Sequence, residues 1–298
     1  MQKGPPTPKG FRDIEPELAQ KRRDVINSII EVLEDAGFVP LETPTVEFAQ
    51  TLKGKYGEEE RLIYEFKDRG GRDLALRYDL TVPLARYVAN HNPKLPFRRW
   101  QQGQVFRGEN PQAGRFREFT QLDFDTVGPT DLVEDANIIA AAIKAVKAVG
   151  LVNVQMKIND RKNFEGVDKK VVIALDKLEK IGEEKVVDEL IQKGFTKDKA
   201  ASILTSMSNK KPTDDLGAIF AKLEKLGIAK SEYTFDPLLA RGLDYYTGAI
   251  FELRVPSYGN LSIGSGGRYD DLIGMFTNKQ VPAVGFSFGI DRLIEALQ

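Results

Sequence analysis

The chain of 298 residues carries a formal net charge of −1, and 41% of its residues are hydrophobic while 29% are charged. This composition is typical of a soluble globular protein with enough core for one large domain or two unequal ones. The near-zero net charge argues against binding nucleic acid through bulk charge, so any RNA contact has to be local. The chain has no cysteine, which excludes disulfides, thiolate nucleophiles and cysteine-bound zinc.

The sequence also argues against a membrane partner and against a metal site built from protein ligands. No apolar run reaches the roughly 18 residues of a membrane span, and residues 1–10 lack the apolar core of a secretory signal. The single histidine, His91, cannot form a multi-histidine metal site, and we assign it a structural role. We therefore expect a cytoplasmic protein whose Pro/Gly-rich start is a flexible arm. Its catalysis would rely on Arg, Asp, Glu, Tyr and bound metal.

The first elements predicted along the chain are a long helix and several short strands. Helical spacing of apolar residues begins at Pro16, which suits a first helical turn, and ends at Gly37. Residues 38–47 then form a proline-bearing strand, which is tolerated at the edge of a sheet. A polar loop over 49–60 leads to short strands around a tight turn, over 62–66 and 74–78, and a helix follows.

A strand pair with an unusual alternation comes next. Residues 97–108 and 116–128 are rich in β-forming residues, and the loop between them is too long for a tight hairpin. Arginine and phenylalanine alternate over 115–119, so Arg115, Arg117 and Phe119 would share one face of a strand. That face offers cations to phosphates and a ring to a base, although an exposed, arginine-rich edge strand is the alternative. A helix over 131–149 follows this pair.

The second half of the chain changes character twice. Residues 161–230 are Lys- and Glu-rich with helical periodicity, which we interpret as a small helical insertion domain. A β pattern returns at residue 231, and the chain ends with a strand that runs into a helix over 281–294. This order predicts an α+β fold, an antiparallel sheet flanked by helices, with residues 1–160 and 231–298 forming the catalytic domain.

Any nucleotide site in this chain has to be built from arginines. The sequence has no P-loop and no GxGxxG between a strand and a helix, so phosphates would be held by cations on an antiparallel sheet. Another arginine, Arg241, precedes two tyrosines and the β-prone run 249–252. A guanidinium at the mouth of a strand can hold a phosphate or a carboxylate, although a surface arginine in a Tyr-rich hairpin is also possible. The other candidates are Arg107, Arg115, Arg117 and Arg292.

Five segments resemble one enzyme family, in the order that the family has them. Residues 16–47, 106–119 and 283–294 are similar to the first, second and third motifs of class II aminoacyl-tRNA synthetases. Residues 239–252, which read LARGLDYYTGAIFE, and residues 266–270, GGRYD, resemble the histidine-specific signatures of histidyl-tRNA synthetases. The resemblance covers nearly the whole chain, and it implies the class II catalytic fold.

The resemblance also implies a reaction and a nucleotide site. The carboxylate of histidine would attack the α-phosphorus of ATP, and the histidyl group of the resulting adenylate would pass to tRNA(His). Arg107 and Arg241 would be the catalytic residues, flanking the α-phosphate. Mg²⁺ would accompany ATP, held largely by phosphate oxygens. The residues that the family pattern assigns to ATP, reaching from the adenine to the γ-phosphate, are Arg107, Glu109, Arg115, Phe119 and Arg292.

For the amino acid, the resemblance implies one group of residues for each end of histidine. Asp79 and Thr81 would hold the α-ammonium group, and Gln121 would lie on the carboxylate side. An acidic acceptor and a phenol can satisfy both ring nitrogens of an imidazole. The residues that would contact the ring or line its pocket are Asp125, Tyr245, Tyr246 and Tyr269.

Residues 76–83 are most similar to the archaeal and eukaryotic branch of the family, and residues 16–47 imply a homodimer. The chain ends at Gln298, just after the third motif, where family members continue into an anticodon-binding domain. We therefore expect a catalytic core without that domain, although a natural short form or a paralogue stays open.

The main alternative function is the synthetase-like regulatory subunit of ATP-phosphoribosyltransferase, a histidine sensor. A second alternative is the synthetase-like sensor region of a stress-responsive kinase, which would bind uncharged tRNA. Because a histidine sensor has no need of a full ATP site, Arg107, Arg115, Arg241 and Arg292 together favour the synthetase.

Overall fold

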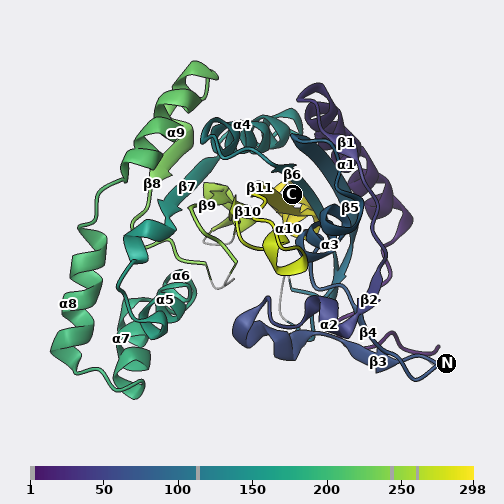
Figure 1. The fold of residues 1–298 in the computed structure, drawn as a ribbon, viewed down its shortest axis with the longest axis horizontal. Coiled ribbons are helices and arrows are strands. Elements are labelled where there is room, and N and C mark those ends of the chain that lie inside the picture. The colour runs from purple at the N-terminus through teal and green to yellow at the C-terminus, as the bar shows by residue number, and fades with distance from the viewer. Residues whose placement is uncertain (1–3, 112–114, 242–244, 260–261) are drawn as a thin grey trace.

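The computed structural model describes residues 4–111, 115–241, 245–259 and 262–298, and its main feature is a large, mostly antiparallel sheet. The described strands of this sheet lie in the order β1-β5-β6-β11-β10-β9-β7-β8 (Figure 1). The edge pairs β1–β5 and β7–β8 run parallel, and the inner pairs run antiparallel. The α+β prediction is therefore confirmed. The strand bounds are β1 Val39–Pro40, β5 Phe97–Phe106, β6 Glu118–Val127, β7 Gln155–Asp160, β8 Tyr233–Phe235, β9 Ala249–Arg254, β10 Ser262–Arg268 and β11 Ala283–Gly289.

A second, smaller sheet takes part of the chain that was predicted as one strand. Residues 38–47 divide into β1 and β2 (Val46–Phe48), and β2 joins β4 (Asp73–Leu76) and β3 (Glu65–Lys67) in a separate three-stranded sheet. Pro44 lies at the break and has no N–H to donate to a ladder, which explains why the strand does not continue. The segment predicted as a loop over 49–60 contains the short helix α2 (Ala49–Leu52).

Helices α1 (Pro16–Asp35), α4 (Val133–Ala148) and α10 (Ile290–Ala296) pack on one face of the large sheet. Figure 1 shows α4 lying between α1 and α9 along this side. The side chains of β6 alternate as a half-buried strand requires, because Leu122 and Phe124 enter the core beneath α1 and α4. The predicted helices over 16–37, 131–149 and at the end of the chain are confirmed by these elements.

The helices expected over 161–230 are present, but they pack in two groups. The first group has its own buried apolar side chains, among them Val172, Leu190 and Leu204. Helix α9 (Asp214–Lys225) instead lies against α4 and contributes Leu216 and Ile219 to the main core. The division of the chain into two domains stays a prediction. The helices of the first group are α5 Lys169–Leu175, α6 Leu178–Ile181, α7 Glu183–Gln192 and α8 Lys197–Ser208.

The N-terminal segment is attached to the rest of the fold, so the expectation of a flexible arm over residues 1–10 is wrong for residues 9 and 10. The backbone N–H of Arg117 donates to Gly10 O at 2.8 Å, and the Arg12 guanidinium lies 3.6 Å from the centroid of the Phe116 ring. Arg12 also forms an ion pair with Asp291 in the first turn of α10. These partners are distant in sequence, so local composition gave no sign of them.

His91 is the last residue of α3 (Thr81–His91), where its Nδ1 donates to Tyr87 O at 3.0 Å and its ring stacks on that of Tyr87. These contacts agree with the structural role that we assigned to it. Within the described residues, no helix is both long enough and apolar enough to cross a membrane.

Candidate active site

One cavity of about 530 Å³ is lined by residues of β6, β9, β10 and β11 of the large sheet, together with residues of neighbouring helices and loops. Arg107, Arg241 and Arg292, which come from three distant segments, line this one cavity. Residues 112–114 and 242–244 of the family-like segments lie outside the described residues. Every residue that the family resemblance assigned to the site is in the lining: Asp79, Thr81, Arg107, Glu109, Arg115, Phe119, Gln121, Asp125, Arg241, Tyr245, Tyr246, Tyr269 and Arg292.

The floor of the cavity is formed by β6 and β11. Alternate residues of β6 face the cavity, namely Gln121, Asp123 and Asp125, and they lie beside small residues of β11. A Cβ atom added at Gly285 would lie 1.8 Å from Asp125 Oδ1, so glycine is required for the carboxylate to occupy this place. We use the name cavity floor for the polar side chains at this end of the cavity, which are the three from β6 and Asp79, which precedes α3.

Asp79 presents one free oxygen to the cavity. Its Oδ1 accepts hydrogen bonds from the Tyr56 hydroxyl at 3.0 Å and from the backbone N–H groups of Thr81 at 3.2 Å and Val82 at 3.0 Å. These N–H groups belong to the first turn of α3, so the helix start fixes the carboxylate. Its Oδ2 is buried without a hydrogen-bond partner, and burial raises the pKa of Asp79. This oxygen can accept a hydrogen bond from a cation.

Asp125 is held between an aromatic wall and a buried arginine. The Tyr269 hydroxyl donates to Asp125 Oδ1, and Arg99 Nη2 lies 2.8 Å from Oδ2. Burial raises the pKa of Asp125, although Arg99 and the Tyr269 hydrogen bond oppose this. The rings of Tyr245 and Tyr246 lie 4.9 Å apart at their centroids. The arrangement is a slot with one anchored acid and aromatic sides, which fits a flat polar ring.

Gln121 and Asp123 share a serine of β11. Gln121 Nε2 donates to Ser287 Oγ at 2.7 Å, while its Oε1 is buried without a partner. The Ser287 hydroxyl in turn is hydrogen-bonded to the carboxyl of Asp123. Asp123 is only 2% exposed, and burial together with the nearby Asp125 raises its pKa to about 7, against the opposing effect of Arg99.

The opposite end of the cavity carries the cations and the ring expected for a nucleotide. The guanidinium of Arg107 lies 4.3 Å from the ring centroid of Tyr78 and 5.1 Å from that of Phe119. Burial lowers the pKa of Arg107, but the neighbouring Tyr78 and the acids Glu59 and Glu109 outweigh burial and raise it. Arg107 is therefore a fixed positive charge between two rings.

Arg241 and Arg292 complete the cationic end. Arg241 Nη1 donates to Glu252 Oε2 at 3.0 Å, while its Nε is buried without a partner. Arg292 Nη1 donates to Ser262 O at 3.2 Å, and its pKa is lowered by burial and by the positive charges of Arg115 and Arg107. Guanidinium groups that repel one another in this way are stabilised by an anion between them.

Two other arginines of the second-motif segment pair with the same glutamate. Arg115 Nη1 lies 3.1 Å from Glu109 Oε2, and Arg117 Nε donates to the backbone oxygen of Glu109 at 3.0 Å. Arg117 is not in the cavity lining, so the prediction that it shares a face with Arg115 and Phe119 is wrong. The reason is that β6 begins only at Glu118 and the strand alternation does not extend back to Arg117.

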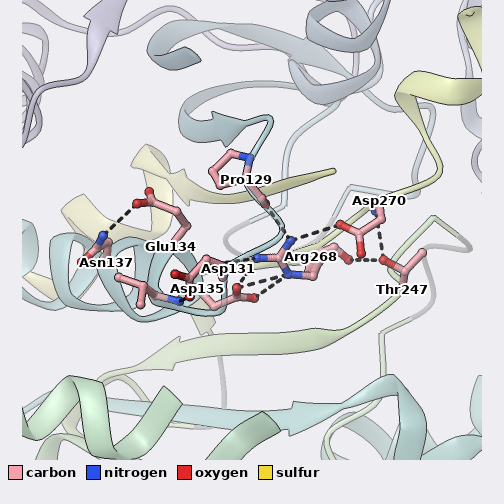
Figure 2. Close-up of polar contacts among 9 residues, drawn as sticks. Pro129, Asp131, Glu134, Asp135, Asn137, Thr247, Arg268 and Asp270 are labelled. Atoms are coloured by element: carbon pink, nitrogen blue, oxygen red, sulfur yellow. Dashed lines mark hydrogen bonds and ion pairs between the residues drawn. The ribbon is translucent and has the colours of Figure 1, made fainter. Parts of the chain in front are cut away.

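Arg268, although it precedes Tyr269, does not line the cavity and holds the fold instead. Figure 2 shows its guanidinium between Asp135 of α4 and Asp270. Its Nε donates to Asp135 at 3.1 Å and its Nη1 to Asp270 Oδ1 at 3.2 Å, and backbone oxygens of Pro129 and Asp131 accept its remaining hydrogen bonds. We call Arg268, Asp135 and Asp270 the Arg268 cluster.

Comparison with known proteins decides the family. The family model described as histidyl-tRNA synthetase matches residues 10–293. The chain belongs to the histidyl-tRNA synthetase family. It is 41% identical to the histidine–tRNA ligase of Aeropyrum pernix, over 98% of this chain and 74% of that protein. It is 38% identical to the histidine–tRNA ligase of Wolinella succinogenes, over 99% of this chain and 75% of that protein.

Solved structures of the histidyl-tRNA synthetase family have the same fold. The histidyl-tRNA synthetase of Nostoc sp. PCC 7120 superposes with a TM-score of 0.82 at 30% identity, covering 99% of this chain and 76% of that one. A Bacillus halodurans protein described as an ATP phosphoribosyltransferase regulatory subunit/histidyl-tRNA synthetase superposes with a TM-score of 0.79 at 25% identity. That match covers 98% of this chain and 83% of the Bacillus protein. The class II architecture that the sequence predicted is thus confirmed.

Three residues in or next to this synthetase-family cavity escaped the sequence reasoning. Asp123 lies between Gln121 and Asp125 in the alternation of β6, so the period-two pattern alone could have identified it. Arg99 lies opposite Asp125 in the β5–β6 register, and Glu252 forms an ion pair with Arg241. No local sequence signal gives either pairing, because both depend on how distant segments are placed in the fold.

Proposed function

We propose that this chain activates histidine with ATP and transfers the histidyl group to tRNA(His). The proposal is carried by the convergence of Arg107, Arg241 and Arg292 on one acid-floored cavity, in a member of the histidyl-tRNA synthetase family. Relatives named histidine–tRNA ligase match nearly the whole chain, which supports the same activity. By the similarity of residues 76–83, we place the chain near the archaeal and eukaryotic branch.

In the first reaction, a carboxylate oxygen of histidine forms a bond to the α-phosphorus of ATP. The bond from that phosphorus to the bridging oxygen breaks, and pyrophosphate leaves with the electron pair. Arg107 and Arg241 stabilise the charge on the transferred phosphoryl group, since both are cations that the protein orients before the reaction. The Arg241 Nε without a partner is the donor that this role requires.

The rest of ATP is bound by residues around this centre. Phe119 stacks on the adenine, with Glu109 over its polar edge, and Arg115 and Arg292 contact the β- and γ-phosphates. Among the described residues, no group of three or more His, Cys, Asp or Glu side chains could hold a metal ion. Mg²⁺ that accompanies ATP would be held largely by the phosphate oxygens and would supply further neutralisation of charge.

At the other end of the cavity, the floor orients histidine. Asp79 Oδ2 and Thr81 accept hydrogen bonds from the α-ammonium group, and Gln121 lies on the carboxylate side. Asp125 and Tyr246 bind the two ring nitrogens, while Tyr245 and Tyr269 close the slot. A site that requires both ring hydrogen bonds rejects amino acids of similar shape without them, because a buried acid would be left unpaired.

In the second reaction, the terminal ribose of tRNA(His) attacks the carbonyl carbon of the adenylate, and AMP leaves. We infer that the chain acts in the cytoplasm. We also infer a homodimer through residues 16–47, supported by exposed apolar side chains such as Val39 at 49% and Phe48 nearby at 50%. Sedimentation of a monomer alone at micromolar concentration would contradict the dimer.

The test is ATP–pyrophosphate exchange with and without histidine, in the presence of Mg²⁺. We expect labelled pyrophosphate to enter ATP only when histidine is present. The alternative, a regulatory subunit that senses histidine, binds histidine and shows no exchange. Exchange that is no higher with histidine than without it would therefore overturn the synthetase proposal, and calorimetric binding of histidine alone would then favour the sensor.

A further inference from the structure

The cavity floor gathers buried carboxyl groups that the protein leaves incompletely hydrogen-bonded. Asp79, Asp123 and Asp125 are each at most 4% exposed, and they lie in one cavity. Arg99 is the buried arginine that forms an ion pair with this group, and its partner is Asp125. A buried carboxylate without a paired cation is costly, and the cost is removed when a ligand brings the cation.

Asp123 is positioned to contact such a ligand. Its Oδ1 is buried without a hydrogen-bond partner, while its carboxyl is oriented by Ser287, which Gln121 holds in place. Asp79 Oδ2 is likewise buried and unpartnered. Two acidic oxygens therefore remain without a proton donor on the lining of the same cavity.

Asp123 lies between Gln121 and Asp125 on the cavity-facing side of β6, and it shares the cavity lining with Asp79. The charge of Asp79 is among the causes that raise the pKa of Asp123, whereas the pKa of Asp125 responds to burial, Arg99 and Tyr269. Tyr246 is also affected by both Asp79 and Asp123. The cations that interact with Asp123 include Arg99, which opposes the rise of its pKa, and Arg77, whose Nη1 and Nε donate to Thr43 O and Gln104 O.

We propose that Asp123 is a second carboxylate that binds the α-ammonium group of the amino-acid substrate, together with Asp79. The inference rests on the proposed function, and it assigns a residue that the family resemblance did not. An ammonium group has three N–H donors and no acceptor. Asp79 Oδ2, the Thr81 hydroxyl and Asp123 Oδ1 supply three acceptors, so each donor finds one partner.

The variant Asp123→Asn tests the inference, because it keeps the shape of the side chain and removes its charge. Calorimetry at pH 8 would compare three probes: histidine, histamine, which keeps the ammonium group and lacks the carboxylate, and imidazolepropionate, which lacks the ammonium group. We expect the affinities for histidine and histamine to fall roughly ten- to a hundredfold, as for loss of a charge-assisted hydrogen bond. The affinity for imidazolepropionate should stay within about twofold.

Asp236→Asn is the matched control. Asp236 is an acid of the same cavity whose Oδ2 already lies 3.0 Å from Lys157 Nζ, and we expect this variant to keep all three affinities. An equal loss for all three probes in Asp123→Asn would overturn the proposal, because it would indicate general damage to the site or a contact with the ring. Unchanged affinity for histamine would overturn it as well, as would a similar loss for histidine and histamine in Asp236→Asn.

Failure of this inference can be told apart from failure of the proposed function. If the wild-type chain shows histidine-dependent exchange but Asp123→Asn retains its affinity for histamine, only the inference is wrong. If the wild-type chain binds histidine without exchange, the synthetase proposal is wrong, and the three probes still report on Asp123. In an active enzyme, we further expect Asp123→Asn to raise KM for histidine about tenfold or more and to leave KM for ATP unchanged.

Discussion

The Arg268 cluster and the cavity floor are both buried groups of charge, and they differ in how completely they are hydrogen-bonded. In the Arg268 cluster, all three guanidinium nitrogens have acceptors, and both oxygens of Asp135 accept from Arg268. On the cavity floor, Asp79, Gln121 and Asp123 each keep a buried oxygen without a donor. The difference indicates where a ligand binds. An unpaired buried polar group destabilises the protein, and a bound partner that hydrogen-bonds to it removes this cost.

The same comparison distinguishes a structural arginine, Arg268, from a ligand-binding one, Arg241. Arg268 is saturated by protein groups, so its contribution is to the stability of the fold. Arg241 keeps a buried Nε without a partner while Glu252 holds its Nη1, so it is oriented by the protein and incomplete without a ligand. Substitution of the first should affect folding, and substitution of the second should affect chemistry.

The largest expected effect is that of Arg241→Ala on catalysis. We expect histidine-dependent exchange to fall by about 10³- to 10⁵-fold, as for other arginines that contact a transferred phosphoryl group. Histidine binding by calorimetry and the unfolding midpoint in urea should stay close to wild type. Arg98→Ala, which removes a half-buried arginine paired with Glu134, serves as the control and should leave exchange intact. Loss of folding and of histidine binding together in Arg241→Ala would show that this arginine is structural.

The reverse outcome is expected for Arg268→Met. Removing the guanidinium leaves Asp135 buried without its cation, so the free energy of unfolding should fall by about 3–5 kcal/mol. Urea unfolding measures this change. Exchange per folded molecule should be retained at low temperature, because Arg268 does not line the cavity. The double variant with Asp135→Leu should regain part of the stability, and a double variant no more stable than Arg268→Met would contradict the account.

A smaller effect concerns the pH dependence of stability. The pKa of Asp123 is raised to about 7 in the folded chain by burial and Asp125. An unfolded carboxyl has a pKa near 4, so between about pH 4 and pH 7 only the folded state binds this proton. The free energy of unfolding therefore falls as the pH rises through that window, because the folded state has to release this proton. Above about pH 7 the whole contribution of this residue is lost.

Asp123→Asn removes this dependence. The stability of the variant relative to wild type, without ligands, should rise by about 2 kcal/mol between pH 5.5 and pH 8. Asp79 and Asp125 remain in both proteins, so their contributions cancel in the difference. Urea unfolding at the two pH values gives the answer, and a difference that is flat or falls with pH would contradict a raised pKa at Asp123.

How far the sequence predicted the molecule depends on the range of the interactions involved. The helix at 16–37, the strand pair that became β5 and β6, and the final strand and helix were all visible as local periodicity. The break of the strand at Pro44 and the attachment of Arg12 to Asp291 were not visible. Both depend on contacts with distant parts of the chain. The sequence alone does not show which strands pair or which distant residues a terminal segment contacts.

The site shows the same division. The family motifs brought Arg107, Arg241 and Arg292 to attention, and the fold gathers them in one cavity. Arg99 escaped because its relation to Asp125 is a matter of cross-strand register. Glu252 escaped because sequence spacing does not reveal its ion pair with Arg241. Asp123 could have been predicted from the sequence, because the period-two alternation of β6 puts it on the same face as Gln121 and Asp125.

The most direct measurement is a crystal structure with histidine and a non-hydrolysable ATP analogue bound. The account predicts the α-ammonium nitrogen within hydrogen-bond distance of Asp79 Oδ2 and Asp123 Oδ1, the imidazole beside Asp125, and the α-phosphate between Arg107 and Arg241. A structure in which these buried atoms stay unpartnered, with the ligands bound elsewhere, would contradict the claim that the unsatisfied groups mark the site.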